Sequence, residues 1–260
     1  KIASLFTNTL TDVGIGNQGY EEVQKIQSAL TGGISANFIL IPNDDNLSHS
    51  LGLKITSKSL EEKEKEMQDL MIETAKNANF SDKNRVKDML NFISSDIEKS
   101  LIQNGHILSM SNAAAQINNI SATSDNVLGI NFISNTSELS KKIDKKLELE
   151  KYIELLESIK NKINPIPSFT FTASSLDMNK SKINFEHINK NNFFDTQSYF
   201  DIQEESVGWI TGAQVTYCAE AFPTVDFFHE DAPALSVLGA VLRNGYLHSA
   251  IREKGGAYGS

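Results

Sequence analysis

The hydrophobic pattern changes period several times along the chain, and each change predicts a structural element. "GYEEVQKIQSAL" (19–30) carries its apolar residues on one helical stripe, and a Gly-Gly pair follows it. "ISANFILI" (34–41) is a mostly apolar stretch typical of a buried strand, and Pro42 stops it. "LGLKITSK" (51–58) alternates apolar and polar residues, which predicts a half-exposed strand. With another helix at the N-terminus, the first sixty residues are predicted as helix, helix, strand, strand.

From Leu60 onward the apolar residues recur at helical spacing. This pattern predicts helices over four segments: 59–78, 82–103, 107–119 and 147–163. The densest basic stretch, "SKKIDKKLELEKY" (140–152), interleaves acids with lysines and is interpreted as a solvated helix face. "PSFTFTASS" (167–175) then alternates large apolar with small polar residues, which predicts a strand with one buried face.

The last part of the sequence predicts a second unit. Residues 176–204 are polar and rich in Asn and Lys, as expected of a connector with a short helix. "VGWITGAQVTY" (207–217) alternates like a strand. A loop and a helix over 234–253 follow, with Asp231 as the expected N-cap and Pro233 in the first turn.

This order of elements predicts an α+β fold, in which an antiparallel sheet packs against helices, rather than a regular βαβ alternation. The predicted domains are an α+β domain over 1–175, a connector over 176–204, and a second, similar α+β domain that opens over 205–260. One strand and one helix cannot build an independent sheet. We therefore expect the second domain to be truncated and the chain to be a fragment.

Charge and composition exclude several partners. Among 260 residues, 33 acids face 24 bases, and a net charge of −9 opposes binding to nucleic acid phosphates. No apolar run approaches the roughly 20 residues that a membrane-spanning helix needs. The first residues show no signal-peptide pattern. A fragment could have lost one, so the compartment stays open, with the cytoplasm favoured over a periplasmic or organellar location.

The chain offers no ligand set for a metal ion. Its 5 histidines include no His-x-x-x-His pair. "INFEH" (183–187) has Ile183 where an inverted zinc motif needs histidine, and "FHED" (228–231) is better explained by helix capping. Cys218 is the only cysteine and lies in a strand-like run, which predicts a small buried hydrophobe. No G-x-S-x-G elbow occurs, and the glycine-rich "REKGGAYGS" follows a helix, unlike a phosphate-binding loop.

Arg252 and Tyr258 remain as candidate functional residues. At 100° per residue, Arg252 falls on the edge of the helical stripe that contains Gly245. Gly255 and Gly256 then end the helix and let the chain reverse, so that Tyr258 could face the same side. One reading is that Arg252 only caps carbonyls at the helix C-terminus. The other is that guanidinium and phenol together bind a peptide carbonyl and stabilise the oxyanion formed on attack.

Three stretches carry a resemblance to a known family. "LRNGYLHSAIREKGGAYG" resembles the C-terminal half of the insulinase/pitrilysin zinc peptidases (inverzincins), most closely their presequence-protease-like branch. The stretch 5–38 looks like the opening of that family's third domain, and "AEAFPTVDFFHEDAPALSVLG" like the run into its fourth. The resemblance implies that Arg252 and Tyr258, around Gly255 and Gly256, reach the substrate at a zinc ion held by the other half.

The family's enzymes are built from two similar halves, each of two α+β domains, that close around a chamber. The first half carries H-x-x-E-H and a downstream Glu. This chain has "LFTNT" (5–9) at the corresponding place. The resemblance implies a C-terminal, non-zinc-binding half of a metalloendopeptidase of short unstructured peptides, inactive without the N-terminal half of the same polypeptide, which holds the zinc. The alternatives are a non-catalytic scaffold or partner subunit of the same family, or an adaptor domain with a coincidental tail.

Overall fold

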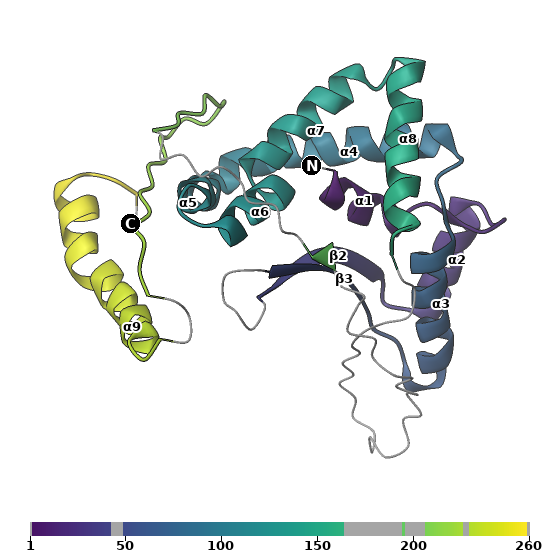
Figure 1. Cartoon of the computed structure of the whole chain (residues 1–260), viewed down its shortest axis with the longest axis horizontal. Coiled ribbons are helices and arrows are strands. Elements are labelled where there is room, and N and C mark those ends of the chain that lie inside the picture. The colour runs from purple at the N-terminus through teal and green to yellow at the C-terminus, as the bar shows by residue number, and fades with distance from the viewer. Residues whose placement is uncertain (1, 43–48, 164–193, 196–205, 226–228, 259–260) are drawn as a thin grey trace. The chain divides into compact units, whose positions relative to one another are not determined.

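The computed structural model describes residues 2–42, 49–163, 194–195, 206–225 and 229–258 (Figure 1). The chain forms two compact units, Lys1–Ala221 and Phe222–Ser260, and each is treated by itself. The second unit consists of α9 (Ala232–Leu242) and a π-helix that continues it (Arg243–Lys254).

The first unit combines a small antiparallel sheet with helices. Its helices are α1 (Ala3–Leu10), α2 (Tyr20–Leu30), α3 (Glu64–Asn77), α4 (Lys83–Gln103), α5 (Gly105–Ala115), α6 (Asn119–Leu128), α7 (Ile130–Lys142) and α8 (Lys146–Lys160), with a 3₁₀ turn at Glu61–Lys63. Its strands are β1 (Gly14–Ile15), β2 (Ile34–Pro42), β3 (His49–Ser57), β4 (Ala78–Asn79) and β5 (Phe194–Asp195). This arrangement confirms the predicted α+β class.

The central ladder is the hairpin of β2 and β3. They pair antiparallel from Ile34 opposite Ser57 to Pro42 opposite His49, and β5 pairs with the other edge of β3. Both strands were predicted from the sequence. The apolar stretch of β2 is typical of a buried strand, and the alternation of β3 is typical of a strand with one covered face. Separately, β1 and β4 form a two-stranded antiparallel pair.

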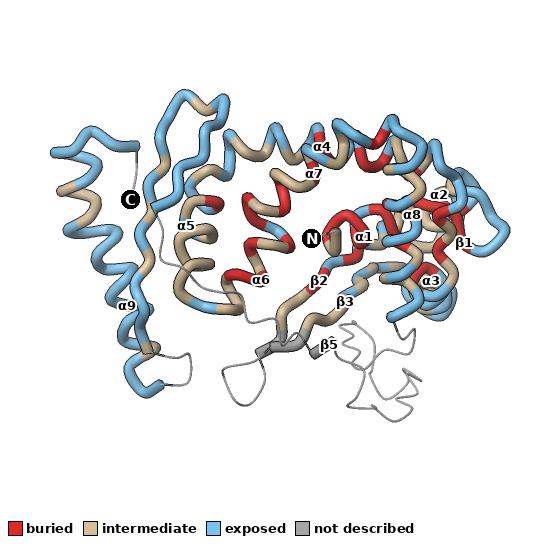
Figure 2. Tube along the Cα trace, turned by 45° about the horizontal axis from the view of Figure 1, so that its top comes forward, coloured by how far each residue is buried: buried red, intermediate tan, exposed pale blue. Residues whose placement is uncertain are grey.

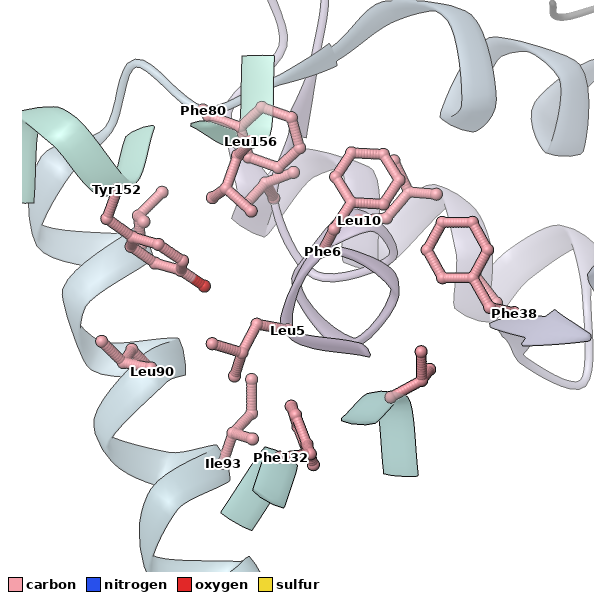
Figure 3. Packing of buried hydrophobic residues seen from close by; sticks show 14 of the residues in the cluster. Leu5, Phe6, Leu10, Phe38, Phe80, Leu90, Ile93, Phe132, Tyr152 and Leu156 are labelled. Atoms are coloured by element: carbon pink, nitrogen blue, oxygen red, sulfur yellow. The ribbon is translucent and has the colours of Figure 1, made fainter. Parts of the chain in front are cut away.

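Helix α1 lies at the centre of the core, between the sheet and the other helices (Figures 1 and 2). Phe6 is fully buried and packs its ring 6.4 Å from that of Phe38 on β2 and 5.9 Å from that of Phe80. Figure 3 shows side chains from α4 and α8 closing over the other side of α1, with Leu90 and Tyr152 among them. The core therefore joins residues from the N-terminus of the first unit as far as α8.

The helix predictions are correct for α2, α3, α4, α5 and α8, with boundaries displaced by a few residues. Asp82 caps α4 by accepting a hydrogen bond from the Arg85 backbone N–H at 3.0 Å. Helices α6 and α7 were not predicted from the sequence. The basic stretch 140–152 is not one solvated helix face, because it contains the junction of α7 and α8, where Ile143 is buried.

Two predictions in the later part of the chain are wrong. Residues 207–217 bend at Gly212, Gln214 and Val215 and pair with no strand in the described part of the structure. Cys218, expected to be buried, is exposed, since no sheet forms around it. The predicted strand at 167–175 lies outside the described residues. The predicted boundaries 1–175, 176–204 and 205–260 stay a prediction.

The hydroxyl of Tyr152 is the one polar atom in the aromatic part of the core that lacks a partner among the described residues. Tyr152 is 1% exposed, and its oxygen points toward α1 (Figure 3). Burial raises the pKa of Tyr152 to about 12, and the nearby Thr9 hydroxyl offsets this only in part. The Thr9 hydroxyl itself donates to the Leu5 carbonyl at 2.7 Å and makes no hydrogen bond to the phenol within ordinary limits.

We therefore expect Tyr152→Phe to leave the free energy of unfolding unchanged or to raise it by up to about 1 kcal/mol, because an unpaired buried hydroxyl is removed. Phe6→Ala should lower it by about 3–5 kcal/mol through the cavity it leaves. Urea unfolding of the 260-residue chain measures both, with Tyr246→Phe as the exposed control. A loss above about 1 kcal/mol in Tyr152→Phe would show that the hydroxyl has a buried partner.

Candidate functional site

Arg252 and Tyr258 lie at the end of the second unit. Arg252 is in the last turn of the π-helix, and Tyr258 follows the glycine pair. Both side chains are exposed, Tyr258 to 89%. Neither makes a hydrogen bond, an ion pair or a ring contact with another described side chain, so both donors are free to bind something else.

The turn between them depends on both glycines. The N–H of Gly256 donates to the carbonyl of Arg252 at 3.1 Å, and the N–H of Ala257 donates to that of Ile251, also at 3.1 Å. Gly256 has φ +73°, which L side chains rarely adopt. A Cβ on Gly255 would lie 2.5 Å from the Ile251 carbonyl oxygen. The nested bonds resemble a Schellman cap, widened to fit a π-helix.

This cap bears on the alternative role of Arg252. The carbonyl oxygens of Ile251 and Arg252 accept from backbone amides, so the Arg252 guanidinium is not needed as their cap. The structure does not bring the guanidinium into hydrogen-bonding contact with the Tyr258 phenol either. Their joint action on a carbonyl stays a prediction.

The predicted α-helix over 234–253 is correct only as far as Leu242. Beyond it the helix is of the π type, in which each hydrogen bond spans five residues and each residue turns by less than 100°. Gly245 and Arg252 therefore do not share the stripe that α-helical geometry predicts. Consistent with the wider turn, His248 Nδ1 lies 3.7 Å from Glu253 Oε1, five residues further on.

The "FHED" stretch starts α9, as its capping interpretation predicts, but through a different side chain. Asp231 is the N-cap residue, yet its carboxylate accepts no capping hydrogen bond. Instead, His229 Nδ1 accepts from the Asp231 backbone N–H at 3.2 Å. Pro233 occupies the first turn, as expected.

A glycine motif not predicted as functional from the sequence runs from β1 to the start of α2. "GIGNQG" (14–19) matches G-x-G-x-x-G before a helix, the spacing of phosphate-binding loops. Here the loop amides are already engaged: Ile15 N–H donates to Gln18, and Gly16 N–H donates to Asn77. Two glutamates occupy the first turn of α2 and would repel an anion. The motif therefore serves a tight turn and not a phosphate.

The most enclosed carboxylate of the described chain is Asp125 of α6, which is 0% exposed. Burial raises its pKa, and neutral hydrogen-bond donors offset this only in part. Its oxygens accept from Asn112 Nδ2 at 3.2 Å, Asn131 Nδ2 at 2.8 Å and the Ile130 backbone N–H at 3.2 Å. A Cβ on Gly129 would collide with this carboxylate, so glycine is required there.

The described residues do not fit a zinc ion. No three His, Cys, Asp or Glu side chains gather closely enough in this part of the chain to hold a metal. Likewise, none of the described helices combines the length and apolarity needed to cross a membrane.

Comparison with known proteins places the chain in a peptidase family. The profile of a family described as associated with the M16 peptidases of subfamily C matches residues 1–139, the part that holds the β2–β3 hairpin, α1 and the helices up to α7. The chain therefore belongs to this peptidase-associated family, and its resemblance to the insulinase-type C-terminal region is confirmed.

Individual relatives extend the similarity to the whole chain. The chain is 28% identical to the mitochondrial presequence protease of Drosophila melanogaster over 268 residues, which cover 100% of this chain and 26% of the relative. The mitochondrial presequence protease of Yarrowia lipolytica is 27% identical, covering 98% and 27%. The protein HypA of Clostridium perfringens is 24% identical, covering 98% and 26%. The chain thus spans about a quarter of the length of these relatives.

The expected compartment is wrong. The cytoplasm was expected rather than an organelle, since the first residues show no signal-peptide pattern. The relatives from Drosophila melanogaster and Yarrowia lipolytica are named as mitochondrial proteins, which points to an organelle. Targeting segments lie at the N-terminus of a precursor, and a chain that spans about a quarter of its relatives need not include it. The first residues therefore hold no information about compartment.

We expect the 260-residue chain to bind no stoichiometric zinc at neutral pH, because a stable zinc site needs three or four converging nitrogen, sulfur or carboxylate ligands. Titration calorimetry and elemental analysis after dialysis measure this directly. A tight 1:1 site found by both methods would contradict the expectation.

Asp125 should make stability depend on pH. Its raised pKa means that the folded state holds the proton more tightly than the unfolded chain, whose carboxyl titrates near 3.8. The contribution of Asp125 to the free energy of unfolding is therefore greatest below that value. It decreases as the pH rises from there through the raised pKa.

The amide introduced by Asp125→Asn does not titrate, so this decrease is absent from the variant. The free energy of unfolding of the wild type minus that of the variant should therefore fall as the pH rises from about 3 to about 7. Urea unfolding at several pH values measures the difference. Asp69→Asn, which changes an exposed carboxylate on α3, is the matched control. A difference that stays constant or grows with pH would show that the carboxyl pKa is not raised.

Proposed function

We propose that this chain is part of a zinc metalloendopeptidase that degrades short unstructured peptides. In it the chain supplies chamber wall and substrate-binding surface, and Arg252 and Tyr258 donate hydrogen bonds to the carbonyl under attack. Family membership and the names of the relatives support the peptidase class. The observation that carries the roles of the two residues is their exposure, without partners, on either side of a cap that requires both glycines.

Guanidinium and phenol suit this task chemically. When a peptide carbonyl is attacked, its oxygen gains negative charge, and donors already in place stabilise that charge without reorganising. Arginine stays charged at every relevant pH and presents a planar set of N–H donors, while tyrosine adds a single O–H. A fixed turn between the two limits how far their backbones can move apart.

The zinc ion and its ligands would belong to the N-terminal half of the same polypeptide, which is the proposed partner. The exposed surface of α9 supports a unit that packs against further polypeptide. This helix is apolar on every side, with Val237, Leu238 and Val241 among its exposed residues. Helices of this composition are normally buried in folded proteins. Without that partner the chain is proposed to be inactive.

Substitutions in the full-length protein test the two donors. Arg252→Ala and Tyr258→Phe should each lower kcat/KM for a short peptide by tens-fold or more, the loss seen when one oxyanion donor is removed. Arg243→Ala and Tyr246→Phe are matched controls, because both side chains are exposed on the same π-helix. Unchanged turnover in both Arg252 and Tyr258 variants would remove their catalytic role.

A non-catalytic scaffold or partner subunit of the same family is the second candidate. It is favoured by the absence of a ligand cluster from the described residues. The sequence of the parent polypeptide upstream of Lys1 distinguishes the two candidates. An H-x-x-E-H motif with a downstream glutamate there would show that the parent is an enzyme.

A further inference from the structure

The segment 206–221, here called the strap, contacts helix α5 at two places (green in Figure 1, before the second unit). One anchor is Tyr217, whose hydroxyl donates to the Ile102 carbonyl at 3.1 Å. Its ring lies 6.2 Å from the ring of His106 and fills the space where a Cβ on Gly105 would be. Glycine at the start of α5 therefore admits the Tyr217 ring.

The second anchor lies further along α5, toward its C-terminal end. Trp209 Nε1–H donates to Asn112 Oδ1 at 3.3 Å. The other end of the same amide, Asn112 Nδ2, donates to Asp125 Oδ2. A continuous chain of hydrogen bonds thus connects the buried carboxylate of α6 to the strap.

Asp125 dictates which way the Asn112 amide faces. An ionised carboxylate only accepts hydrogen bonds, so Asn112 must turn its NH₂ group toward Asp125. Its carbonyl oxygen then points toward Trp209, whose indole N–H only donates. If the amide were reversed, donors would meet at the Trp209 end and acceptors at the Asp125 end. Asn131, donating from α7, holds the same oxygen, Asp125 Oδ2, while the Ile130 backbone N–H donates to Oδ1.

Polar contacts dominate the docking of the strap, because little apolar surface supports it. Ile210 is fully exposed, and Val207 and Val215 are each more than 40% exposed. Within the described chain the strap makes no backbone–backbone hydrogen bond. A few side-chain hydrogen bonds therefore decide whether it stays on α5.

We propose that Asp125 is a positioning residue that acts through Asn112. It orients the Asn112 amide so that Trp209 and the strap are held on α5, and it thereby sets where the chain leaves the first unit toward the segment that carries Arg252 and Tyr258. Only the catalytic role of the segment with Arg252 and Tyr258 rests on the proposed function. The docking of the strap does not.

Trp209 reports on this docking directly, because it is the only tryptophan of the chain. Acrylamide quenching of its fluorescence in the 260-residue chain measures how accessible the indole ring is to the quencher. Losing one hydrogen bond should shift the docked-to-free equilibrium by about twofold to tenfold, so Asp125→Asn and Asn112→Ala should both raise the quenching constant. Asp69→Asn, the exposed control, should leave it unchanged.

A double variant separates positioning from general damage. In Asp125→Asn combined with Asn112→Asp, the donor and the acceptor exchange places. The new carboxylate on α5 accepts from both the new amide on α6 and the Trp209 N–H, and the Asn131 amide turns over so that its oxygen accepts from the new amide. We expect this double variant to recover most of the wild-type protection of Trp209. Simple destabilisation of α6 would be made worse by a second change.

The outcomes are distinct. Quenching at the wild-type level in folded Asn112→Ala and Asp125→Asn chains would overturn the proposal, as would a double variant no better protected than Asp125→Asn. Circular dichroism establishes folding, and if Asp125→Asn does not fold, Asn112→Ala decides alone. Because quenching needs no peptide hydrolysis, failure of the peptidase proposal would leave these results intact, and an undocked strap would leave the peptidase proposal untouched.

Discussion

The burial of helix α1 is the constraint on which the first unit depends. An α-helix of 8 residues is too short to persist in water, since helices below about 12–15 residues are marginal there. It forms because Leu5, Phe6 and Leu10 are enclosed on all sides. The sheet, the segment after β4 and the long helices α4 and α8 each cover part of it (Figures 2 and 3). The N-terminal residues therefore act as the common contact for elements drawn from the rest of the unit.

Apolar packing of this kind does not by itself fix how helices are turned relative to one another, and the polar groups add that information. Arg85 shows how: its Nε donates to the Asp12 carbonyl at 2.8 Å, while its guanidinium lies 4.3 Å from the centre of the Tyr20 ring. Asp125 does the same for α5, α6 and α7, because a buried carboxylate tolerates only arrangements that satisfy its oxygens. The position of the strap follows from that arrangement.

The second unit is stabilised differently from the first. It is a single apolar helix that widens into a π-helix, and its order comes from local hydrogen bonds and the glycine cap. Such a unit presents side chains without enclosing them, which suits residues that act on a bound molecule. The same openness means that the unit does not determine what Arg252 and Tyr258 contact.

Much of the first unit could be predicted from the sequence, because its signals are local. Period-two alternation predicts β3, the apolar run ended by Pro42 predicts β2, and Asp82 marks the start of α4. The motif "IREKGGAYG" points to Arg252 and Tyr258, and the glycine turn between them is present. Spacing alone, however, assumed an α-helix there, whereas the π-helix alters which residues share a face.

What only the tertiary structure decided depends on contacts between residues far apart in the sequence. The alternating pattern of 207–217 predicts a strand, but a strand forms only where a partner offers its backbone. The segment instead contacts α4 and α5 through Tyr217 and Trp209. Asp125 gives no signal in the sequence, because its burial and its raised pKa arise from the packing of α5, α6 and α7 around it. Local periodicity determined the elements, and long-range packing determined which polar groups were removed from water.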